Sequence, residues 1–389
     1  MNSPLIYIIA GEPSGDLLAA RLMAALKQLT DHSVRFAGIG GEAMRAEGLE
    51  SLFPQADLAV MGFAEVVPRI PKILARLRQT LNDIEAKQPS LIVTVDSWGF
   101  TGRVAKALKK KGSAIPRLHY VAPMVWAWKE KRARTLAERV DKLLCLLPNE
   151  PAYFARHGLS AVHVGHSVLE RLGEPGDGKG FRRRHGIPEE APLLCVLPGS
   201  RTSETSRLLP VFAETAERMA ERFPGLHLAI PTVETVSDSV RRAVAGWRGP
   251  AVVVGNEEKW GAFAASDAAL AASGTVALEL AVSAVPMVIA YRVAPLTAML
   301  VRRLLTIKYA CLLNLLVDRL VVPELLQEKC TPGGLTEALT PLMRDGPARR
   351  EQLAGCAEAL EALGVEGERP SWRAAREALS MIRNEEGKL

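Results

Sequence analysis

The chain has 389 residues, which is too long for one typical hydrophobic core and predicts two domains. Hydrophobic residues make up 48% and charged residues 24% of it, as in ordinary folded proteins, and no apolar run is long enough to span a bilayer. The formal net charge of +6 favours anionic partners such as nucleotides, phosphorylated lipids or a membrane surface. Nucleic acid is not expected, because like charges form no block and aromatic residues reach only 5%.

The cysteines and the N-terminus indicate the compartment. Five cysteines are scattered along the chain and none forms a C-x-x-C pair, so neither a disulfide framework nor a zinc site is expected. The N-terminus lacks the basic start and apolar core of a signal peptide. We therefore expect a protein of a reducing compartment that is soluble or peripheral to a membrane.

The first half of the chain has the pattern of a parallel α/β sheet. Short apolar stretches are each followed by a turn or a helix, as buried strands of such sheets are. These predicted strands span residues 5–10, 34–39, 91–95, 117–121, 142–147 and 162–167. The predicted fold class is therefore α/β.

The turn after the first strand, Gly11-Glu12-Pro13-Ser14-Gly15-Asp16, is a candidate ligand site, because open parallel sheets bind ligands at such turns. A helix is predicted over residues 17–29. Three polar side chains at one turn exceed what helix capping needs, although Ser14 or Asp16 as the N-cap is the structural alternative. The turn is not G-x-G-x-x-G, so the dinucleotide signal is absent.

Three further positions in this half are candidates for function. Asp96 directly follows the strand over 91–95, at the end where parallel sheets place their chemistry. Trp126 and Trp128 precede a run of cations, which favours a platform for a sugar, a ring or a lipid head group, with core filling as the alternative for one of them. His166 is interpreted as structural, because a lone histidine beside glycine usually is.

The stretch from Leu58 to Pro71 is apolar and holds two prolines, which predicts a poor helix. A basic run follows it. Apolar residues beside cations suit a lipid surface, and the alternative, slightly favoured by the residues alone, is a core-packed segment with a solvated basic helix.

A stretch rich in glycine, residues 173–181, is the predicted linker between two domains. The expected domains are residues 1–172 and 182–360, followed by a helical segment over 361–389. We expect the C-terminal helix either to cross back to the first domain or to pack on a partner chain.

The second half repeats the α/β pattern. Its predicted strands span residues 193–197, 226–230, 251–254, 268–272 and 287–291. Among the leucines that follow, Asn314 is a lone polar residue.

Two turns of the second half favour a nucleotide. Ser273-Gly274-Thr275 enters a helix, whose free N–H groups and dipole suit a phosphate, and Glu279 lies one turn later, where it can accept two hydrogen bonds from a ribose diol. An ordinary βαβ connection with a surface glutamate is the equally weighted alternative. Arg201, after another strand, presents a planar fork suited to a diphosphate.

Two Rossmann-like α/β domains with strand-end sites on either side of a mid-chain linker predict a cleft closed by hinge motion. That is the layout of a GT-B nucleotide-sugar glycosyltransferase. A set of motifs along nearly the whole chain then identifies the family that the sequence resembles. They are Ala10 to Asp16, Ala59 to Phe63, His119 to Pro123, Val125 to Trp128, Val164 to Ser167, Leu197 to Arg201, Ala272 to Thr275, Ala277 to Glu279 and Asn314 to Leu316. In their order and spacing these motifs resemble the lipid-A-disaccharide synthase family.

The resemblance implies a reaction. A UDP-2,3-diacylglucosamine donor and 2,3-diacylglucosamine 1-phosphate (lipid X) would give the β-1,6-linked disaccharide 1-phosphate of lipid A and UDP. It implies a peripheral protein on the inner face of the bacterial cytoplasmic membrane, without cofactor or metal. The chain has no D-x-D motif, so Arg201 and the Ser273–Thr275 turn are expected to supply the positive field instead.

The resemblance also assigns residues. A β bond made from an α donor implies inversion, with one displacement and a general base, for which Asp96 is the candidate and Glu12 the rival. The expected donor site comprises Gly199, Ser200, Arg201, Ser273, Gly274, Thr275, Glu279 and Asn314. The expected acceptor site in the first domain comprises Gly11, Ser14, Gly15, Asp16 and Trp126. The expected membrane or acyl contacts are Val60, Met61, Phe63, Val66, Arg302 and Arg303.

One departure from the family and two alternatives stay open. The family pattern D-x-P-D-F is here Asp96-Ser97-Trp98-Gly99-Phe100, so no role of a second carboxylate carries over. A different UDP-sugar enzyme of the GT-B kind, such as an epimerase or a transferase with a soluble acceptor, is one alternative. A nucleotide-binding module without turnover is the other, and a homodimer stays open as the assembly.

Overall fold

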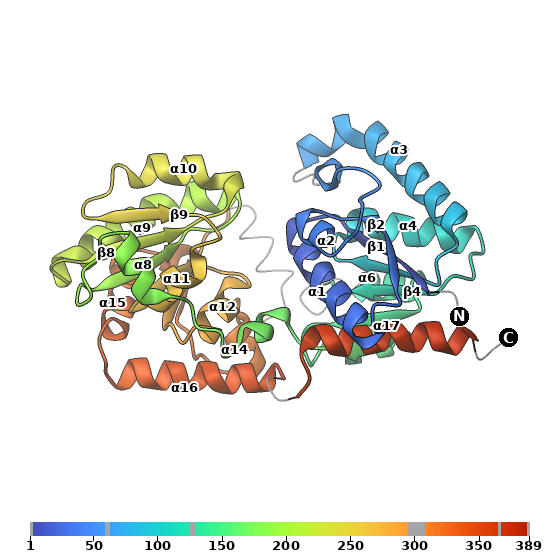
Figure 1. Cartoon of the computed structure of the whole chain (residues 1–389). Helices are drawn as coiled ribbons and strands as arrows, with labels where there is room; N and C mark the ends of the chain where they lie inside the picture. Colours follow the sequence, from blue (N-terminus) through green and yellow to red (C-terminus); the bar gives the residue numbers. More distant parts are fainter. Residues whose placement is uncertain (1–2, 59–62, 124–129, 295–307, 365–366, 387–389) are drawn as a thin grey trace. The chain divides into compact units, whose positions relative to one another are not determined.

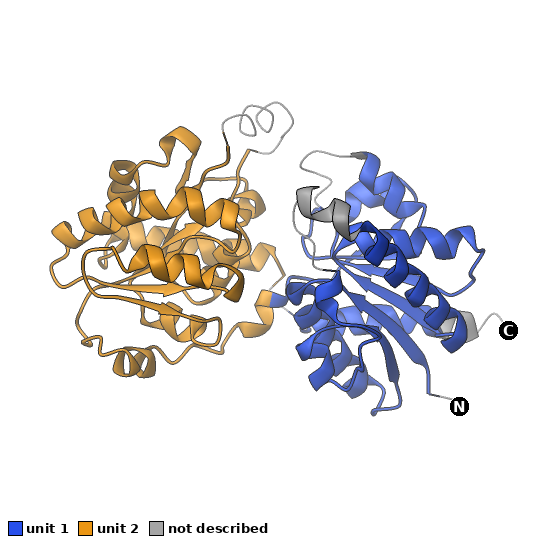
Figure 2. Cartoon of the chain, turned by 90° about the horizontal axis from the view of Figure 1, so that it is seen from above, with its two compact units in different colours: residues 1–167, 366–389 blue, residues 168–365 orange. Residues whose placement is uncertain are grey.

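A computed structural model of the chain describes residues 3–58, 63–123, 130–294, 308–364 and 367–386. The chain divides into two compact units (Figure 2). Unit 1 comprises residues 1–167 and 366–389, and unit 2 comprises residues 168–365.

Unit 1 is built on a parallel six-stranded sheet with the order β2-β1-β3-β4-β5-β6. Its strands are β1 (Leu5–Ala10), β2 (Arg35–Ile39), β3 (Leu91–Val95), β4 (Arg117–Tyr120), β5 (Lys142–Cys145) and β6 (Ser160–His163). Its helices are α1 (Pro13–Leu29), α2 (Glu42–Ala46), η1 (Gln55–Asp57), α3 (Phe63–Lys87), α4 (Trp98–Lys110), α6 (Glu130–Ala137), α7 (Pro151–Ala155) and α17 (Pro370–Glu386). The chain leaves β1 toward β2 on one side and returns to β3 on the other, so the strand order reverses between β1 and β3.

Alternate residues of β1 serve the two faces of this sheet, as the pleat requires. Ile6 and Ile8 pack with α1 and α17, while Tyr7 and Ile9 pack with α3 and α4. Both faces are therefore covered, which explains why the strands have continuous apolar sequences. Figure 1 shows α17 alongside α1.

Unit 2 repeats the design with a six-stranded sheet in the order β12-β11-β10-β7-β8-β9. Its strands are β7 (Leu193–Leu197), β8 (His227–Pro231), β9 (Ala251–Val254), β10 (Ala268–Ala272), β11 (Met287–Tyr291) and β12 (Glu324–Leu326). Its helices are η2 (Ser167–Arg171, whose first residue belongs to unit 1), α8 (Gly178–Arg184), α9 (Thr202–Arg222), α10 (Glu234–Val244), α11 (Lys259–Ala265), α12 (Val276–Val282), α14 (Leu312–Val317), η3 (Gln327–Lys329), α15 (Pro332–Leu339), η4 (Thr340–Leu342) and α16 (Pro347–Ala362). Here the strand order reverses between β7 and β10. The predicted pair of Rossmann-like α/β domains is confirmed, and the short strand β12 was not predicted.

The C-terminal helix α17 belongs to unit 1. Of the two expected arrangements, the structure shows the one in which this helix crosses back to the first domain. Its residues Ala374, Ala375 and Ala378 are fully buried in the same core as β1 and α1. Lys142 on β5 adds an ion pair to Glu377, with 2.7 Å between Nζ and Oε2.

The glycine-rich stretch that was predicted to be a linker is packed in unit 2. A Cβ on Gly176 would lie 1.9 Å from the carbonyl oxygen of Trp260, and one on Gly178 would lie 2.6 Å from that of Ala264. Asp177 caps α8 by accepting a hydrogen bond from the Gly180 N–H at 2.8 Å. The glycines here permit close approach to α11, so composition alone misled the linker prediction.

Helix α3 is a second difference from the sequence prediction. The helix runs continuously from Phe63 to Lys87 through both Pro68 and Pro71, where a poor helix was expected. The two prolines are the sixth and ninth residues of this helix, beyond the first turn where proline is best tolerated.

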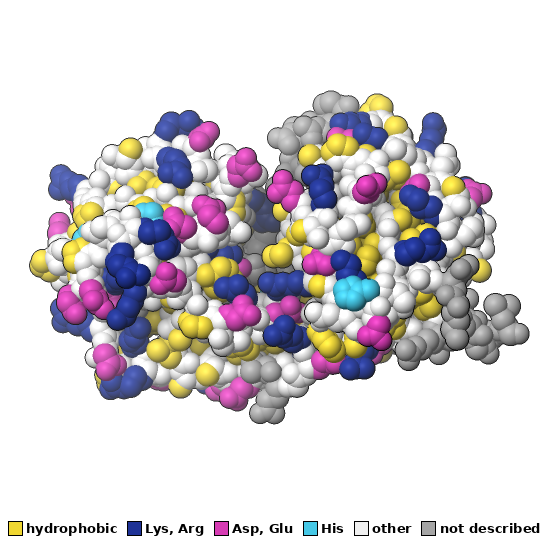
Figure 3. Space-filling view, in the orientation of Figure 1, with side chains coloured by type: hydrophobic (Ala, Val, Ile, Leu, Met, Phe, Trp, Pro, Cys, Tyr) yellow, Lys and Arg dark blue, Asp and Glu magenta, His cyan; other side chains and the backbone are white. Residues whose placement is uncertain are grey.

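Basic and acidic side chains are interspersed over the described surface on the face seen in Figure 3, in keeping with a sequence in which like charges form no block. Among the described residues no helix is long and apolar enough to cross a membrane.

Candidate functional site

In unit 1, strand register brings two predicted site segments together at the point where the strand order reverses. Ala10 of β1 is the register partner of Val95 of β3, so Gly11 and Asp96 follow on adjacent strands. A Cβ on Gly11 would lie 2.9 Å from Ser97 Oγ, which shows how closely the two turns pass. Such a position is where open α/β sheets bind ligands.

The backbone at Asp96 is strained. Asp96 and Ser97 have φ values of 48° and 45°, in the left-handed region that residues with a Cβ seldom adopt. Neighbouring Val121 has φ 85°, a strong outlier for a β-branched residue. The Asp96 N–H donates to Tyr120 O at 2.9 Å, and Thr101 Oγ1 donates to Asp96 O at 2.9 Å. Strain of this kind costs about 1–3 kcal/mol per residue and concentrates at functional sites.

The residues that depart from the family pattern have different surroundings. The Trp98 ring meets the His119 ring edge-on, with centroids 4.9 Å apart, and lies against Gly102, where a Cβ would come within 2.8 Å of it. Gly99 is exposed, and a Cβ there would meet no atom within 4 Å. Trp98 is therefore a packing residue, and position 99 has room for a side chain.

His119 on β4 contacts both Trp98 and the neighbouring strand β3. It is 1% exposed, and its Nδ1 lies 2.8 Å from Thr94 Oγ1 on β3. Burial lowers the pKa of His119 to about 3, so the ring is neutral at physiological pH.

The first turn differs in detail from the prediction. Helix α1 begins at Pro13, with Glu12 as its N-cap residue in an extended conformation, so neither Ser14 nor Asp16 is the cap. Proline is favoured at this first helical position. Glu12 is half-buried and Ser14 is exposed, whereas Gly15 lies close to Val95 of β3.

Asp16 has a structural role at the start of α2, and its place in the acceptor site stays a prediction. It is 5% exposed, and its carboxylate accepts backbone N–H groups of Gly41 at 2.7 Å, Ala43 at 2.9 Å and Met44 at 3.2 Å. These N–H groups begin α2 and have no partner within the helix. The carboxylate is thereby committed to joining α1 to α2.

In unit 2, register again brings predicted segments together where the strand order reverses. Leu197 of β7 pairs with Ala271 of β10, so the turn over residues 198–201 and the turn over 273–275 follow on adjacent strands. Ala272 in turn pairs with Ala290, which places Tyr291 at the same edge.

The turn over residues 198–201 is held by Glu204, a residue that the sequence analysis missed. Glu204 is 8% exposed; its Oε2 accepts the Ser200 N–H at 3.2 Å and its Oε1 accepts Arg201 Nη1 at 3.1 Å. Gly199 has φ 108°, and a Cβ there would lie 2.6 Å from Glu204 Oε2. Burial, and after it the negative charge of Glu204, raises the pKa of the Tyr291 hydroxyl. The side chain of Arg201 stays 61% exposed, so most of its donors can reach a ligand.

The turn over residues 273–275 has an exposed backbone, and no side chain of it caps helix α12. Ser273 Oγ donates to Ala310 O at 3.1 Å, and Thr275 occupies the N-cap position of α12 without a side-chain hydrogen bond. Gly274 and Thr275 are exposed, and Gly274 has no neighbouring atom within 4 Å of a Cβ position. The hydroxyl of Thr275 therefore does not cap the helix.

Glu279 is paired, which the sequence analysis did not anticipate. Its Oε1 accepts Lys259 Nζ at 2.8 Å, and the two side chains are 24% and 17% exposed. Lys259 also lies over the Trp260 ring, 5.2 Å from its centroid. The pair fixes Glu279 and leaves its second oxygen for a ligand.

Asn314 has a structural role in unit 2, and its contact with the donor stays a prediction. It is fully buried; its Oδ1 accepts the N–H groups of Val321 and Val322, both at 2.8 Å, and its Nδ2 donates to Val322 O at 2.8 Å and Glu324 Oε1 at 2.7 Å. All its usual hydrogen-bonding capacity is used. The second oxygen of Glu324 accepts the Ala310 N–H at 2.8 Å, and Ala310 O accepts from Ser273 Oγ, so a chain of hydrogen bonds links Asn314 to the turn over residues 273–275.

Several predicted positions lie outside the described residues or have undescribed side chains. Trp126, Val60, Met61, Arg302 and Arg303 belong to the first group. Phe63 and Val66 belong to α3, of which only the backbone is described there. No cluster of three potential metal ligands occurs within the described ranges.

Comparison with known proteins shows the family. A family model described as lipid-A-disaccharide synthetase matches residues 6–377. A protein of Paramagnetospirillum magneticum named lipid-A-disaccharide synthase is 57% identical over 381 residues, covering 97% of this chain and 98% of its own. A protein of Rhodospirillum centenum with the same name is 49% identical over 383 residues, covering 98% and 96%.

Solved structures with low sequence identity share the fold. S. aureus MnaA, in a structure with UDP, has a TM-score of 0.65 at 12% identity, covering 99% of this chain and 98% of its own. The glycotransferase of kitacinnamycin has a TM-score of 0.62 at 16% identity, covering 98% and 100%. With a family model that spans most of its length and relatives of such identity and coverage, the chain belongs to the lipid-A-disaccharide synthetase family.

Proposed function

We propose that the protein is an inverting glycosyltransferase of lipid A biosynthesis. It transfers the diacylglucosamine of UDP-2,3-diacylglucosamine to 2,3-diacylglucosamine 1-phosphate, giving the β-1,6 disaccharide 1-phosphate and UDP. The observation that carries the proposal is the convergence of family-matching turns at the reversal point of each sheet: Glu12 with Asp96 in unit 1, and Arg201 with Ser273–Thr275 in unit 2.

Unit 2 binds the donor. The exposed guanidinium of Arg201 and the backbone N–H groups of Gly274 and Thr275 hold the diphosphate. Glu279, fixed by Lys259, accepts hydrogen bonds from the ribose hydroxyls. As the bond to the sugar breaks, charge grows on the UDP oxygen, and these fixed donors stabilise it without a metal ion.

Unit 1 activates the acceptor. Inversion in one displacement needs a general base on the attacking 6-hydroxyl. Asp96 is that base in our proposal, because its strained backbone is fixed from β4 and α4, and Glu12 on the adjacent turn is the rival. Gly11, Ser14 and Gly15 line the same turn and complete the acceptor side.

The protein acts as a peripheral enzyme on the inner face of the cytoplasmic membrane. Ile70 and Leu74, one turn apart on α3, are 44% and 48% exposed, with exposed Lys72 and Arg78 beside them. An exposed apolar row beside cations fits a surface of anionic lipid. Phe63 and Val66, earlier on the same helix, and the predicted contacts Val60, Met61, Arg302 and Arg303 extend this proposal.

An assay in detergent micelles with both diacylglucosamine substrates, analysed by mass spectrometry with and without EDTA, tests the reaction. Equal amounts of disaccharide 1-phosphate and UDP in both conditions are expected. UDP binding without product would instead favour a binding module, and product only with water-soluble sugar acceptors would favour another UDP-sugar enzyme. Activity lost with EDTA would contradict the metal-independent proposal.

A further inference from the structure

A short segment of unit 1, residues 51–57, connects three parts of the structure that the proposed function uses separately. It runs beside β2, where the Leu52 N–H donates to Gly38 O at 2.9 Å and the Gly40 N–H donates to Ser51 Oγ at 3.1 Å. It ends in the single turn of η1, which carries Gln55 and Asp57. We call these residues the bridging segment.

Gln55 joins the bridging segment to the turn that carries Glu12. Its Nε2 donates to Ala10 O at 2.9 Å and to Glu12 O at 3.2 Å, the carbonyls on either side of Gly11. Both amide hydrogens are therefore spent on this turn. The side chain also approaches Gly41, where a Cβ would lie 2.7 Å from Gln55 Oε1, so Gln55 is held on both sides.

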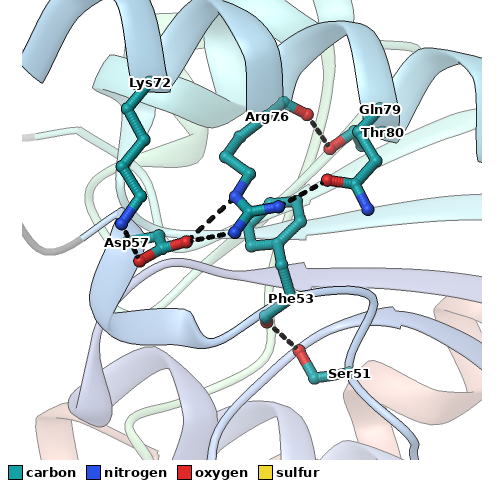
Figure 4. A network of polar contacts seen from close by, with 7 residues as sticks. All are labelled: Ser51, Phe53, Asp57, Lys72, Arg76, Gln79 and Thr80. Carbon is teal, nitrogen blue, oxygen red and sulfur yellow. Dashed lines mark hydrogen bonds and ion pairs between the residues drawn. The ribbon is translucent and has the colours of Figure 1, made fainter.

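Asp57 joins the other end of the bridging segment to helix α3 (Figure 4). Its Oδ1 accepts Lys72 Nζ at 2.5 Å, and its Oδ2 accepts Arg76 Nε at 2.9 Å and Nη2 at 2.6 Å. The hydrogen bond from Lys72, with that from Arg76, holds the pKa of Asp57 below its usual range. The Asp57 side chain is 12% and that of Arg76 27% exposed, so this pair is partly shielded from solvent, whereas Lys72 is 54% exposed and its pair with Asp57 is a surface pair.

Arg76 is itself fixed, so the connection is stiff. Its guanidinium lies 4.6 Å from the centroid of the buried Phe53 ring and donates from Nη1 to Gln79 Oε1 at 2.7 Å. Figure 4 shows the guanidinium between Asp57 and Gln79, with the Phe53 ring beside it. The same helix carries the exposed Ile70 and Leu74 that we propose to face lipid.

We propose that Gln55 and Asp57 are positioning residues that fix the Glu12 turn to helix α3, so that the helix proposed to dock on lipid also sets the geometry of the acceptor turn. The inference rests on the proposed function. Neither residue touches substrate: Asp57 fixes the bridging segment to α3, and Gln55 fixes the carbonyls around Gly11 to the bridging segment. A misplacement of about 1 Å at a reacting group can cost about 10²-fold in rate, so a modest loosening is measurable.

The test compares Gln55→Leu, Asp57→Asn and the double variant with the wild type, in full-length protein. Glu85→Gln is the matched control, because Glu85 lies on the same helix and pairs with Lys111, not with the bridging segment or Arg76. We expect kcat to fall about 10-fold in Gln55→Leu and less in Asp57→Asn, with KM and UDP affinity unchanged. The double variant should be no slower than Gln55→Leu, because both changes release the same turn.

Hydrogen exchange supplies a readout that does not depend on activity. Amides of residues 10–16 should exchange faster in Asp57→Asn, although Asp57 contacts none of them, and should be unchanged in Glu85→Gln. Gln55→Glu, which keeps the size of the side chain but loses the donor amide, replaces Gln55→Leu if the latter does not fold.

The outcomes separate this inference from the proposed function. An active wild type with unchanged kcat in Gln55→Leu, or unchanged exchange of residues 10–16 in Asp57→Asn, overturns the inference alone. If the two losses of kcat multiply in the double variant, Gln55 and Asp57 do not act through the same turn, and that part of the inference is overturned. A wild type that makes no disaccharide overturns the proposed function and this inference with it.

Discussion

At the scale of single residues, the polar side chains of the two predicted sites fall into two groups. Some form hydrogen bonds that hold the backbone, and others are placed where they could contact substrate. Asp16 and Asn314 have their hydrogen-bonding groups occupied by buried backbone and side-chain partners. Asp96 and Glu12 are half-buried and adjacent across two strands. The chemistry of the acceptor side is therefore expected from the second pair.

Asp96→Asn should fold normally and bind UDP as the wild type does, while kcat falls by about 10²–10⁴-fold through loss of the general base. Steady-state kinetics with product detection by mass spectrometry measures this, and Glu12→Gln is the parallel variant. A folded Asp96→Asn protein with near-normal kcat, beside an inactive Glu12→Gln, would transfer the role to Glu12.

Glu204→Gln should weaken UDP binding, because the carboxylate that holds both Arg201 and the Ser200 N–H is lost. A charge-assisted hydrogen bond contributes about 1.5–3 kcal/mol, so a decrease in affinity of about 10-fold is expected by calorimetry. Glu214→Gln is the control, since Glu214 lies on the same helix and pairs with exposed Arg218 at a surface position. Tighter UDP binding in Glu204→Gln would mean that Glu204 competes with the diphosphate for Arg201 rather than orienting it.

Two glycines of α4 should respond in opposite ways to the same change. Gly99→Ala should raise the free energy of unfolding by about 0.5–1 kcal/mol, because the helical backbone gains a favourable residue in open space. Gly102→Ala should lower it by about 1–3 kcal/mol, because its Cβ would meet the Trp98 ring at 2.8 Å. Denaturant unfolding decides the matter, and a destabilised Gly99→Ala protein would show that position 99 is not open.

At the scale of elements, the strands were predictable and the contacts between elements were not. Continuous apolar runs marked eleven strands, because strands covered on both faces need such sequences; β12, only three residues long and half-buried, has no such run. The turns after β1, β3, β7 and β10 were predicted as sites, since each ends a strand at a carboxyl edge. Glu204, Lys259 and Gln55 were missed because each acts through a partner distant in sequence or one helical turn away, with no local pattern. The linker prediction near residue 176 was wrong because glycine content alone does not distinguish a flexible segment from a closely packed one.

Helix α3 is the element whose exposed row can be tested directly. Changing Ile70 and Leu74 together to serine should reduce binding to anionic vesicles by about 10-fold or more, since about 1.5–3 kcal/mol is gained per large apolar side chain fully buried. Vesicle co-sedimentation measures this, and Leu320→Ser is the control, because Leu320 lies in unit 2 and is 63% exposed. Unchanged binding of the double variant would remove this row from the proposed membrane surface.

At the scale of the whole molecule, unit 1 is made of two segments of the chain, and unit 2 is inserted between them, after residue 167 and before residue 366. Removing residues 367–389 should expose the apolar face of α1 and unfold unit 1, while UDP binding by unit 2 persists. Ala378→Asp, at a fully buried position of α17, should reproduce the effect in a full-length chain. Thermal unfolding beside UDP titration measures both, and an intact, active truncated protein would show that α17 is dispensable.

The return of α17 also sets an order of events during synthesis. Domains usually form from the N-terminus onward as the ribosome releases them. Here α17, which completes the core of unit 1, is translated after all of unit 2. Unit 2 can thus fold while the apolar face of α1 in unit 1 is still exposed to solvent. During that interval the nascent protein most needs protection by chaperones.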